Sequence, residues 1–217
     1  MIFNGRAILT TKNSEVDFIN NQAANLFPGE IYTYESRDSI QDDGSPDSDS
    51  DATDYPVELW NSLHISGMPN HILELKLGMP LTIMRNIDVN NGLCNGKKVY
   101  VTRLLRHSIA VRQFNEGSEC LLPRICLIND DEQFPFKLRR RQFPARPAFA
   151  MIIHKAQGQT LSKVGIYLSE PVFTHGQLYV AFSRSTNPRH LHVAIRVNKT
   201  SSDQFTRNVV FPEDILI

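Results

Sequence analysis

Two short stretches in the last third of the chain carry the residue types best suited to phosphate chemistry. Residues 154–160 read His-Lys-Ala-Gln-Gly-Gln-Thr, and residues 176–185 read Gly-Gln-Leu-Tyr-Val-Ala-Phe-Ser-Arg-Ser. A turn with a glycine lets backbone amides approach an anion, while Lys155 adds a charge and Thr160 a hydroxyl donor. Arg184 ends a helix-like segment, and an arginine offered to a transferring phosphoryl group is a recurring catalytic device. The two stretches therefore predict contacts with phosphate groups.

The chain has no loop that could cradle a nucleotide. A P-loop requires a glycine, four residues, and then Gly-Lys followed by Ser or Thr. The only Gly-Lys pair is Gly96-Lys97, with Asn91 five positions before Gly96 and Lys98 after the pair. The acids at 130–132 follow an apolar run as in a Walker B segment, but a strand that ends in a solvated acidic turn gives the same pattern. A Walker B carboxylate binds the Mg²⁺ of a nucleotide that a P-loop holds, so without a P-loop such a carboxylate would have no function here.

Charge is balanced in sum and uneven along the chain. The formal net charge of the 217 residues is zero, which argues neither for nor against a nucleic-acid partner. Residues 35–54 hold eight acids against Arg37 alone, so we expect a mobile acidic segment that is dispensable for folding. A cluster of basic residues follows later in the sequence and balances these acids: Lys137, Arg139, Arg140, Arg141 and Arg146.

The cysteines and histidines indicate the redox state of the protein's compartment and whether the chain has a metal site. Cys94, Cys120 and Cys126 are isolated and odd in number, which predicts a reducing intracellular compartment. No apolar run approaches the roughly 18 residues that a membrane span needs, and the N-terminus lacks a secretory signal pattern. The seven histidines show no metal-ligand spacing, so no metal site is predicted.

Hydrophobic patterning predicts an α/β domain with an all-β segment inside it. Residues 6–11 and 31–34 are expected to be strands, on either side of a helix capped by Asn13 or Ser14, with Glu15 in its first turn. Between residues 73 and 128, five or six short strands separated by Asn-Gly turns favour a small antiparallel barrel.

The α/β pattern returns near Pro147. We expect a short helix over 149–157 that Gly158 terminates, then a strand over 164–168, a helix over 175–185 and a closing strand over 191–197. Tyr179 is expected to be core or support, and the buried stripe of the second helix to be Leu178, Val180, Ala181 and Phe182.

Four further segments complete an ordered set of motifs. They are Ala-Ile-Leu-Thr-Thr-Lys-Asn at 7–13, Leu-Lys-Leu-Gly-Met-Pro at 75–80, Asn-Gly-Leu-Cys-Asn-Gly at 91–96 and Leu-Arg-Arg-Arg-Gln-Phe-Pro at 138–144. With the two stretches above, the chain resembles the C-terminal half of a superfamily 1 DNA helicase of the Pif (petite integration frequency) type, especially the versions related to Helitron transposons. The motifs occur in the same order as in the family. The ordered set is therefore specific evidence for the resemblance, whereas any single motif would be weak evidence.

The resemblance implies the fold class and the domains. It implies an α/β fold in which residues 1–34 and 136–217 form the second RecA-like parallel-sheet domain. Residues 57–135 would form an inserted small antiparallel β-barrel (Src-homology-3-like), and residues 35–56 an acidic flexible loop. In the family, the first RecA-like domain carries the P-loop and the magnesium carboxylate. That N-terminal domain is missing here, so the chain is not expected to hydrolyse ATP alone.

The resemblance also implies site residues. Arg184 would contact the ATP γ-phosphate, and Gln157 and Gly158 belong to the motif that links the ATP and DNA sites. The implied contacts with single-stranded DNA are Thr10, Asn13, His154, Lys155, Gln159, Thr160, Arg139, Arg140 and Arg141. Each has a structural alternative: N-capping for Asn13, a polar helix cap for the 154–160 turn, a helix-end salt bridge for Arg184 and a solvated charge run for the three arginines.

The implied function is that of an ATP-dependent 5′-to-3′ DNA helicase in DNA repair, recombination or telomere maintenance. ATP and Mg²⁺ would be bound mainly by the missing domain, and no membrane partner is implied. The implied location is the nucleus, with the mitochondrion as the alternative. Two other functions fit parts of the sequence. One is a non-catalytic DNA-binding module or decayed Helitron fragment, and the other is a partner-binding small-barrel protein.

Overall fold

The computed structural model describes residues 3–41, 56–65, 67–114, 118–129, 134, 136–196 and 206–211. The chain forms two compact units: Met1–Leu26 with Ala148–Ile217 is unit 1, and Phe27–Pro147 is unit 2. The sequence placed residues 27–34 and 136–147 in the RecA-like domain, whereas here they belong to unit 2. No helix in the described ranges is both long and apolar enough to cross a membrane.

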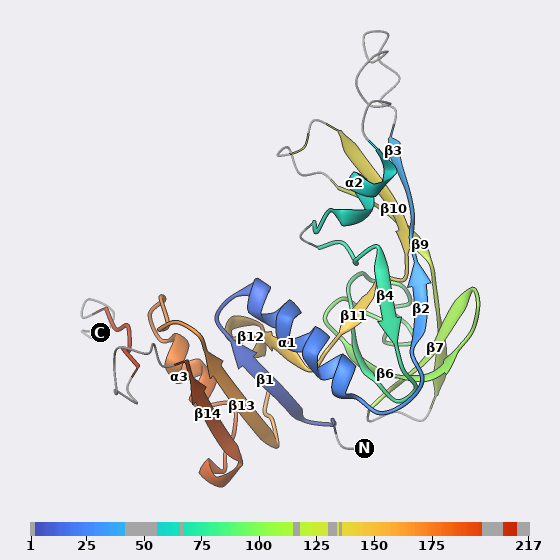
Figure 1. Ribbon diagram of the computed structural model, residues 1–217. Helices are drawn as coiled ribbons and strands as arrows, with labels where there is room; N and C mark the ends of the chain where they lie inside the picture. The colour runs from blue at the N-terminus through green and yellow to red at the C-terminus, as the bar shows by residue number, and fades with distance from the viewer. Residues whose placement is uncertain are drawn as a thin grey trace. The chain divides into compact units, whose positions relative to one another are not determined.

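Unit 1 is built on a four-stranded parallel sheet with the strand order β12-β1-β13-β14 (Figure 1). Its strands are β1 (Arg6–Thr10), β12 (Ala150–Ile152), β13 (Lys163–Leu168) and β14 (Leu191–Ile195). Its helices are α1 (Asn13–Leu26), the short 3₁₀ helix η1 (Ile153–Ala156), α3 (Gln177–Phe182) and the 3₁₀ helix η2 (Pro188–His190). Parallel strands need a crossover between them, and here α1, with unit 2 inserted after it, separates β1 from its neighbour β12.

The core of unit 1 joins the sheet to its helices. Its fully buried members come from β1, η1, β13 and α3, and they include Leu9, Ile153, Val164, Leu168 and Ala181. Helix α1 is fixed by a polar contact as well, because the buried Asn20 Oδ1 accepts hydrogen bonds from the backbone N–H groups of Phe149 (3.0 Å) and Ala150 (2.9 Å). These bonds satisfy buried donors where β12 begins.

Two helices expected in the last third differ from the prediction. Residues 149–157 are not a helix, because Ala150–Ile152 extend and pair with Ile8–Thr10, and only Ile153–Ala156 turn, as a 3₁₀ helix. Helix α3 has six residues instead of eleven. Phe182 is 42% exposed, so it is not part of the predicted buried stripe, and Tyr179 is 76% exposed, so it is not a core residue.

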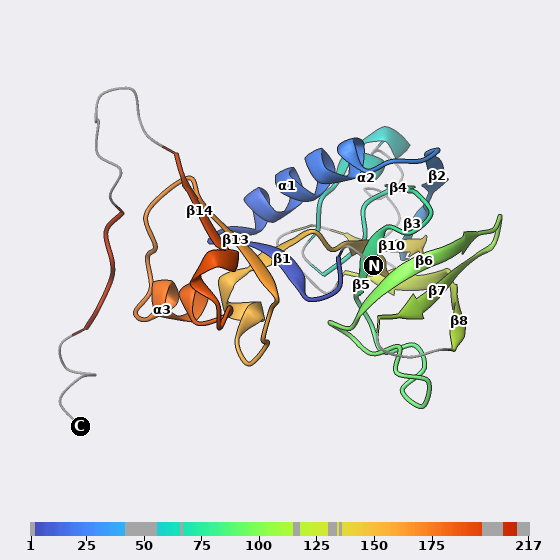
Figure 2. The ribbon, with the colours of Figure 1, turned by 90° about the horizontal axis from the view of Figure 1, so that it is seen from below.

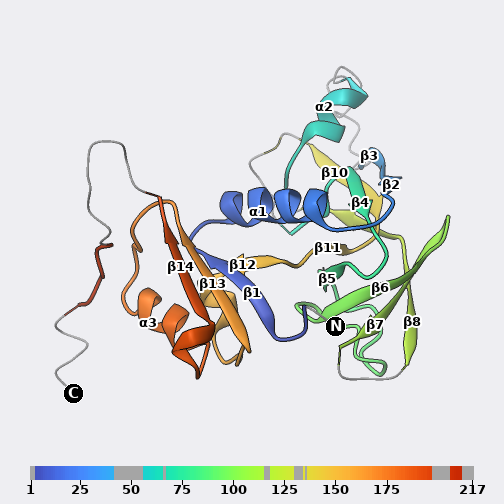
Figure 3. The ribbon, with the colours of Figure 1, turned by 60° about the horizontal axis from the view of Figure 1, so that its bottom comes forward.

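In its described residues, unit 2 consists of antiparallel strands and one short helix, α2 (Val57–Ser62) (Figures 2 and 3). Its largest sheet has the order β11-β5-β6-β7-β8, with bounds Ala145–Pro147, Pro80–Ile83, Lys98–Leu104, Ser108–Gln113 and Glu119–Pro123. A second sheet pairs β2 (Tyr32–Glu35) with β4 (Ile72–Leu75), and a third has the order β3 (Arg37–Gln41), β10 (Lys137–Gln142), β9 (Ile125–Ile128). The predicted α/β fold, a parallel sheet interrupted by an antiparallel insert, is confirmed.

The acidic segment is partly ordered, contrary to the prediction. Residues 37–41 form β3, and Asp38 lies opposite Arg140 of β10, with its side chain 1% exposed. The Arg140 guanidinium is fully buried and donates to both Asp38 carboxylate oxygens, from Nε at 3.1 and 3.0 Å and from Nη2 at 2.7 Å. The remaining predicted acidic segment, residues 42–54, lies outside the described residues, as do the acids at 130–132.

Candidate nucleic-acid and nucleotide interface

Several of the predicted site residues of unit 1 lie where its parallel strands end. Because β1, β12 and β13 run in parallel, their carboxyl ends share one edge of the sheet. Helix α1 starts at Asn13 just after β1, the η1 turn follows β12 directly, and Ser169 follows β13. In open α/β sheets, ligands bind outside the carboxyl ends of the strands. The topology therefore brings the 7–13 motif and the 154–160 turn to the edge where a ligand is expected.

The 154–160 turn has an open backbone conformation. Gly158 has a φ of +78°, and a Cβ added there would meet no atom within 4 Å. Amide donors fold the turn on itself, from Gln157 to the carbonyl of His154 (3.2 Å) and from Gln159 to that of Ala156 (3.0 Å). Ala156 is buried, and the residues predicted to bind phosphate are all exposed: His154, Lys155, Gln157, Gly158, Gln159 and Thr160. The turn is thus anchored by one apolar residue and presents polar groups to solvent.

Arg184 is bonded to this turn. Its Nη1 donates to the backbone carbonyls of Ala156 (3.2 Å) and Gln159 (3.1 Å), and its Nε donates to the carbonyl of Val180 (2.8 Å). Nη2 donates to Ser183 Oγ at 2.8 Å. The described residues hold no salt bridge to Arg184, so the helix-end ion pair considered as its alternative role is not what positions it.

The backbone of Arg184 also forms a hydrogen bond next to the 154–160 turn. The backbone N–H of Leu161, next to Thr160, donates to the Arg184 carbonyl at 2.8 Å. Arg184 therefore holds the turn by both its side chain and its backbone. Four of its five guanidinium N–H groups have partners among the described residues, and one on Nη2 is left for another acceptor.

The structure overturns one predicted contact at the end of β1. Thr10 is fully buried, and its hydroxyl donates to the Glu15 carboxylate, which also accepts a hydrogen bond from Ser169 Oγ. Thr10 is thus a support residue that cannot reach a DNA phosphate. Asn13 is exposed at the start of α1 and remains accessible. Glu15 was expected only as a first-turn acid; its contact with Ser169, 154 residues along the chain, has no local sequence signal.

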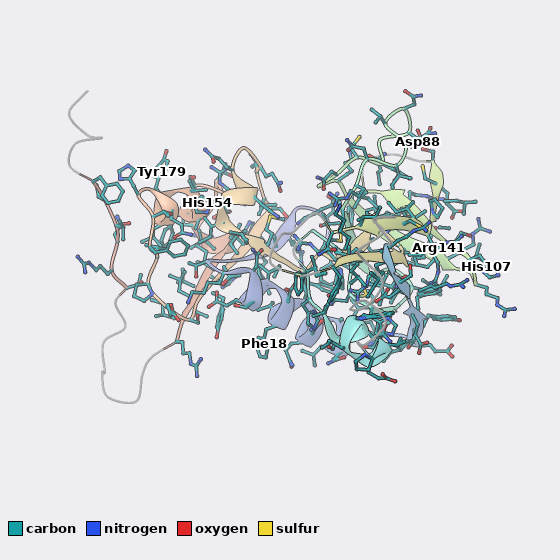
Figure 4. The ribbon with its side chains drawn as sticks, turned by 90° about the horizontal axis from the view of Figure 1, so that it is seen from above. Phe18, Asp88, His107, Arg141, His154 and Tyr179 are labelled. Carbon is teal, nitrogen blue, oxygen red and sulfur yellow. The ribbon has the colours of Figure 1, made fainter. Side chains whose placement is uncertain are left out.

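Two more polar contacts surround the turn. His154 Nε2 lies 3.2 Å from Thr174 Oγ1. Gln177 is 1% exposed; its Oε1 accepts from the Phe173 N–H at 3.2 Å, while its Nε2 has no partner. Tyr179 projects from the same helix at the surface (Figure 4). Neither Thr174 nor the burial of Gln177 could be read from the sequence, because α3 is too short to show a helical period.

The three consecutive arginines of unit 2 divide between two faces of β10. Arg139 and Arg141 are exposed, whereas Arg140 is fully buried with Asp38 and also donates to the carbonyls of Trp60, Leu63 and Pro69. The prediction that Arg140 contacts DNA is therefore wrong, since its donors are all used inside unit 2. The alternation follows from the two-residue period of a strand.

Metal-ligating side chains do not cluster in the described part of the chain. It contains no group of three or more His, Cys, Asp or Glu side chains that could hold an ion.

Comparison with known proteins identifies what this arrangement resembles. Residues 58–104 match the family model described as DNA helicase Pif1, 2B domain. The ATP-dependent DNA helicase PIF1 of Xenopus laevis is 31% identical over 196 residues, which cover 85% of this chain and 27% of that protein. The chain thus spans about a quarter of the length of this curated relative.

Solved structures agree with the sequence match. One, described as the structural basis for DNA unwinding at forked dsDNA by two coordinating Pif1 helicases, is 26% identical with a TM-score of 0.65 and covers 91% of this chain and 41% of its own. The crystal structure of the Pif1 helicase from Bacteroides in complex with ADP-AlF3 and ssDNA covers 99% of this chain and 44% of its own. Its TM-score is 0.66 at 23% identity, which supports the fold alone. In sequence and in fold, the chain is therefore similar to a portion of Pif1-type DNA helicases, as its ordered motifs predicted.

Proposed function

We propose that this chain is the second RecA-like domain, with its insert, of an ATP-dependent 5′-to-3′ DNA helicase of the Pif1 type. Its proposed tasks are to grip single-stranded DNA and to respond to the γ-phosphate of ATP. The observation that carries the proposal is the set of hydrogen bonds from Arg184 to the Ala156 and Gln159 carbonyls. These bonds connect the Arg184 guanidinium, which is suited to contact a transferring phosphoryl group, to the 154–160 turn, which is suited to contact a DNA phosphate.

The proposed DNA grip uses groups that are accessible. Lys155 supplies charge, Thr160 a hydroxyl and Gly158 an open backbone. Asn13 lies at the start of a helix, where the first backbone N–H groups have no carbonyl partner within the helix. His154 and Gln159 flank these groups in the same exposed turn. All of these contacts would be to the sugar–phosphate backbone, so we expect little dependence on base sequence.

The residues present fit only one part of a nucleotide. Among the described residues, one N–H of Arg184 has no acceptor and could donate to a terminal phosphate oxygen, and a bidentate phosphate contact would require Arg184 to leave a carbonyl. Nothing in the sequence forms a P-loop for the other phosphates, so ATP and Mg²⁺ would be held mainly by a separate first domain. When bound, ATP supplies the phosphoryl transfer; Arg184 would place its charge on the outermost phosphate.

The relatives' name supports a setting of DNA metabolism. We place the protein, as part of this proposal, in nuclear DNA repair, recombination or telomere maintenance, or in the replication of a Helitron-related transposon. The competing proposal is a DNA-binding module without catalysis. The two differ in one respect, since only the first requires Arg184 to affect ATP turnover once a first domain is supplied.

The DNA grip can be tested by fluorescence anisotropy with a labelled single-stranded oligonucleotide. The variant K155A/T160A should bind more weakly, and its slope of log affinity against log salt should fall by roughly one, because one phosphate contact by a lysine is lost. The matched control is K163A, since Lys163 is also exposed but begins β13, at the amino end of the strand. Equal affinities and slopes for K155A/T160A and K163A would rule the turn out as the grip.

A further inference from the structure

The exposed face of the three-stranded sheet in unit 2 is cationic. Along β10, the residues on this face are Lys137, Arg139 and Arg141, and all three are exposed. Successive residues on one strand face lie roughly 6.6 Å apart, so the three charges form a straight row. The opposite face of β10 holds the buried residues Leu138, Arg140 and Gln142. The row is thus fixed by the packing on the other face of the strand.

Neighbouring strands add charge to the row. In the antiparallel register, Arg37 of β3 lies directly opposite Arg141, and it is exposed on the same face. Like charges directly opposite each other destabilise a sheet. Arg124, just before β9, is close enough for its charge to interact with that of Arg141. Burial is the main cause of the lowered pKa of Arg124, and the charge of Arg141 lowers it further. Packing of the sheet therefore brings together charges that repel one another.

The arginines of this face are not paired with an acid of the described chain. Arg37, Arg139 and Arg141 form no salt bridge with any described residue. The closest polar contact of Arg139 is to Cys126 Sγ at 3.6 Å. The other exposed neighbours across the strands are Ser39 and Ile128. Arginines that repel one another and form no ion pair with a described residue fit a polyanionic ligand, because the ligand's charge relieves the repulsion.

The chemistry of the face favours one kind of polyanion. Proteins that bind single strands combine positive charge with aromatic side chains on which bases stack. None of the described residues on this face is aromatic, so it offers contacts to phosphates and none to unstacked bases. Duplex DNA presents its phosphates outward and keeps its bases stacked. We propose that the face formed by Arg37, Arg139 and Arg141, defined here as the β10 face, binds the phosphate backbone of double-stranded DNA.

This inference is separate from the single-strand grip proposed for the 154–160 turn, and the experiment keeps the two apart. Anisotropy is measured with a blunt duplex and with a single strand of equal length, over a series of salt concentrations. The test variant is R37Q/R141Q in the full chain. The control is R85Q/R106Q, which removes two exposed arginines that lie outside the three-stranded sheet. R37K/R141K keeps both charges and controls for side-chain shape.

R37Q/R141Q should lower duplex affinity about tenfold or more and reduce the salt slope by roughly two, while single-strand affinity stays within about twofold. R37K/R141K and R85Q/R106Q should keep the parent slope. The thermal midpoint of R37Q/R141Q should equal or exceed that of the parent, because a repulsion is removed. An unchanged duplex slope in R37Q/R141Q, or an equal loss of slope in R85Q/R106Q, overturns the proposal. Equal losses of duplex and single-strand binding in R37Q/R141Q also overturn it, since the face would not be selective for duplex.

Discussion

Arg184 donates a hydrogen bond of 3.1 Å from Nη1 to the backbone carbonyl of Gln159, across 25 residues of sequence. The same nitrogen donates to the Ala156 carbonyl. A phosphate that draws this guanidinium away would have to replace both carbonyls as acceptors. We therefore expect nucleotide contact at Arg184 and the conformation of the 154–160 turn to be linked, because the same donors serve both.

Replacing Arg184 tests that link in the isolated chain. R184A leaves the carbonyls of Ala156 and Gln159 without this donor, and we expect the free energy of unfolding to fall by about 1–2 kcal/mol. Hydrogen exchange of the amides at 157–161 should accelerate, since local opening becomes easier. R184K should rescue little, because lysine lacks the planar fork.

R189A is the matched control for this prediction. Arg189 is exposed in η2, and among the described residues its side chain makes no hydrogen bond to the turn, so exchange at 157–161 should remain at the parent rate. If R184A also exchanges at the parent rate, Arg184 does not hold the turn in solution.

Arg140 and Arg139 are adjacent, yet we expect opposite outcomes when each is removed. R140A leaves Asp38 buried without its partner, and breaking a buried pair in this way costs about 3–5 kcal/mol. R139A removes an exposed side chain and should change the free energy of unfolding by no more than about 0.5 kcal/mol. Urea denaturation followed by the signal of Trp60, whose carbonyl accepts from Arg140, reports on this region. Similar losses in the two variants would contradict the assignment of the two faces.

Lys98 should make the stability of the protein depend on pH. Burial lowers its pKa from 10.5 to about 8, so in the folded state it loses its proton at lower pH than in the unfolded chain. Between these two values the unfolded state binds more protons, and stability should rise with pH. The contribution is complete above pH 10.5 and disappears as pH falls through about 8.

The measurement for Lys98 is a comparison with K98M over this pH range. Other lysines and tyrosines titrate there too, so the difference between the two proteins is the informative quantity. The parent should gain on the order of 3 kcal/mol relative to K98M from pH 7 to pH 11. Parallel stability curves would show that Lys98 is solvated.

ATP hydrolysis should be absent from this chain by itself. The sequence lacks a P-loop, and Arg184 alone can hold only a terminal phosphate. A steady-state assay with single-stranded DNA should give background, whereas turnover near 1 s⁻¹ from a preparation free of contaminating ATPase would contradict the proposal. Fusion to a related first domain should restore turnover, and R184A should then lower it by roughly a thousandfold or more.

Much of the fold could be predicted because the relevant signals are local. The run at Arg6–Thr10, the polar residues where α1 begins and the Asn-Gly turns of unit 2 each act within a few residues. The prediction of a helix over residues 149–157 was wrong because the deciding signal is not local. Its apolar run suits a buried helix or a buried strand equally well, and pairing of Ala150–Ile152 with β1 decided between them.

The site was harder to predict than the fold. Exposure of the 154–160 turn followed from its composition, but the bonds from Arg184 to its carbonyls depend on tertiary packing. The error at Arg140 could have been avoided by assigning residues 137–142 to a strand, because alternate residues then face opposite sides. Its partner Asp38 lies 102 residues away, in a segment whose composition resembles that of disordered chains.

The insertion of unit 2 between α1 and β12 has a consequence for the order of folding. β1 cannot complete its sheet until β12, β13 and β14 arrive from beyond residue 147, and closing so long a loop costs roughly 2 kcal/mol more in chain entropy than closing a ten-residue loop. A folded insert shortens the effective loop. During synthesis on a ribosome, unit 2 emerges after β1 and before β12, so unit 2 can fold before the parallel sheet of unit 1 is complete.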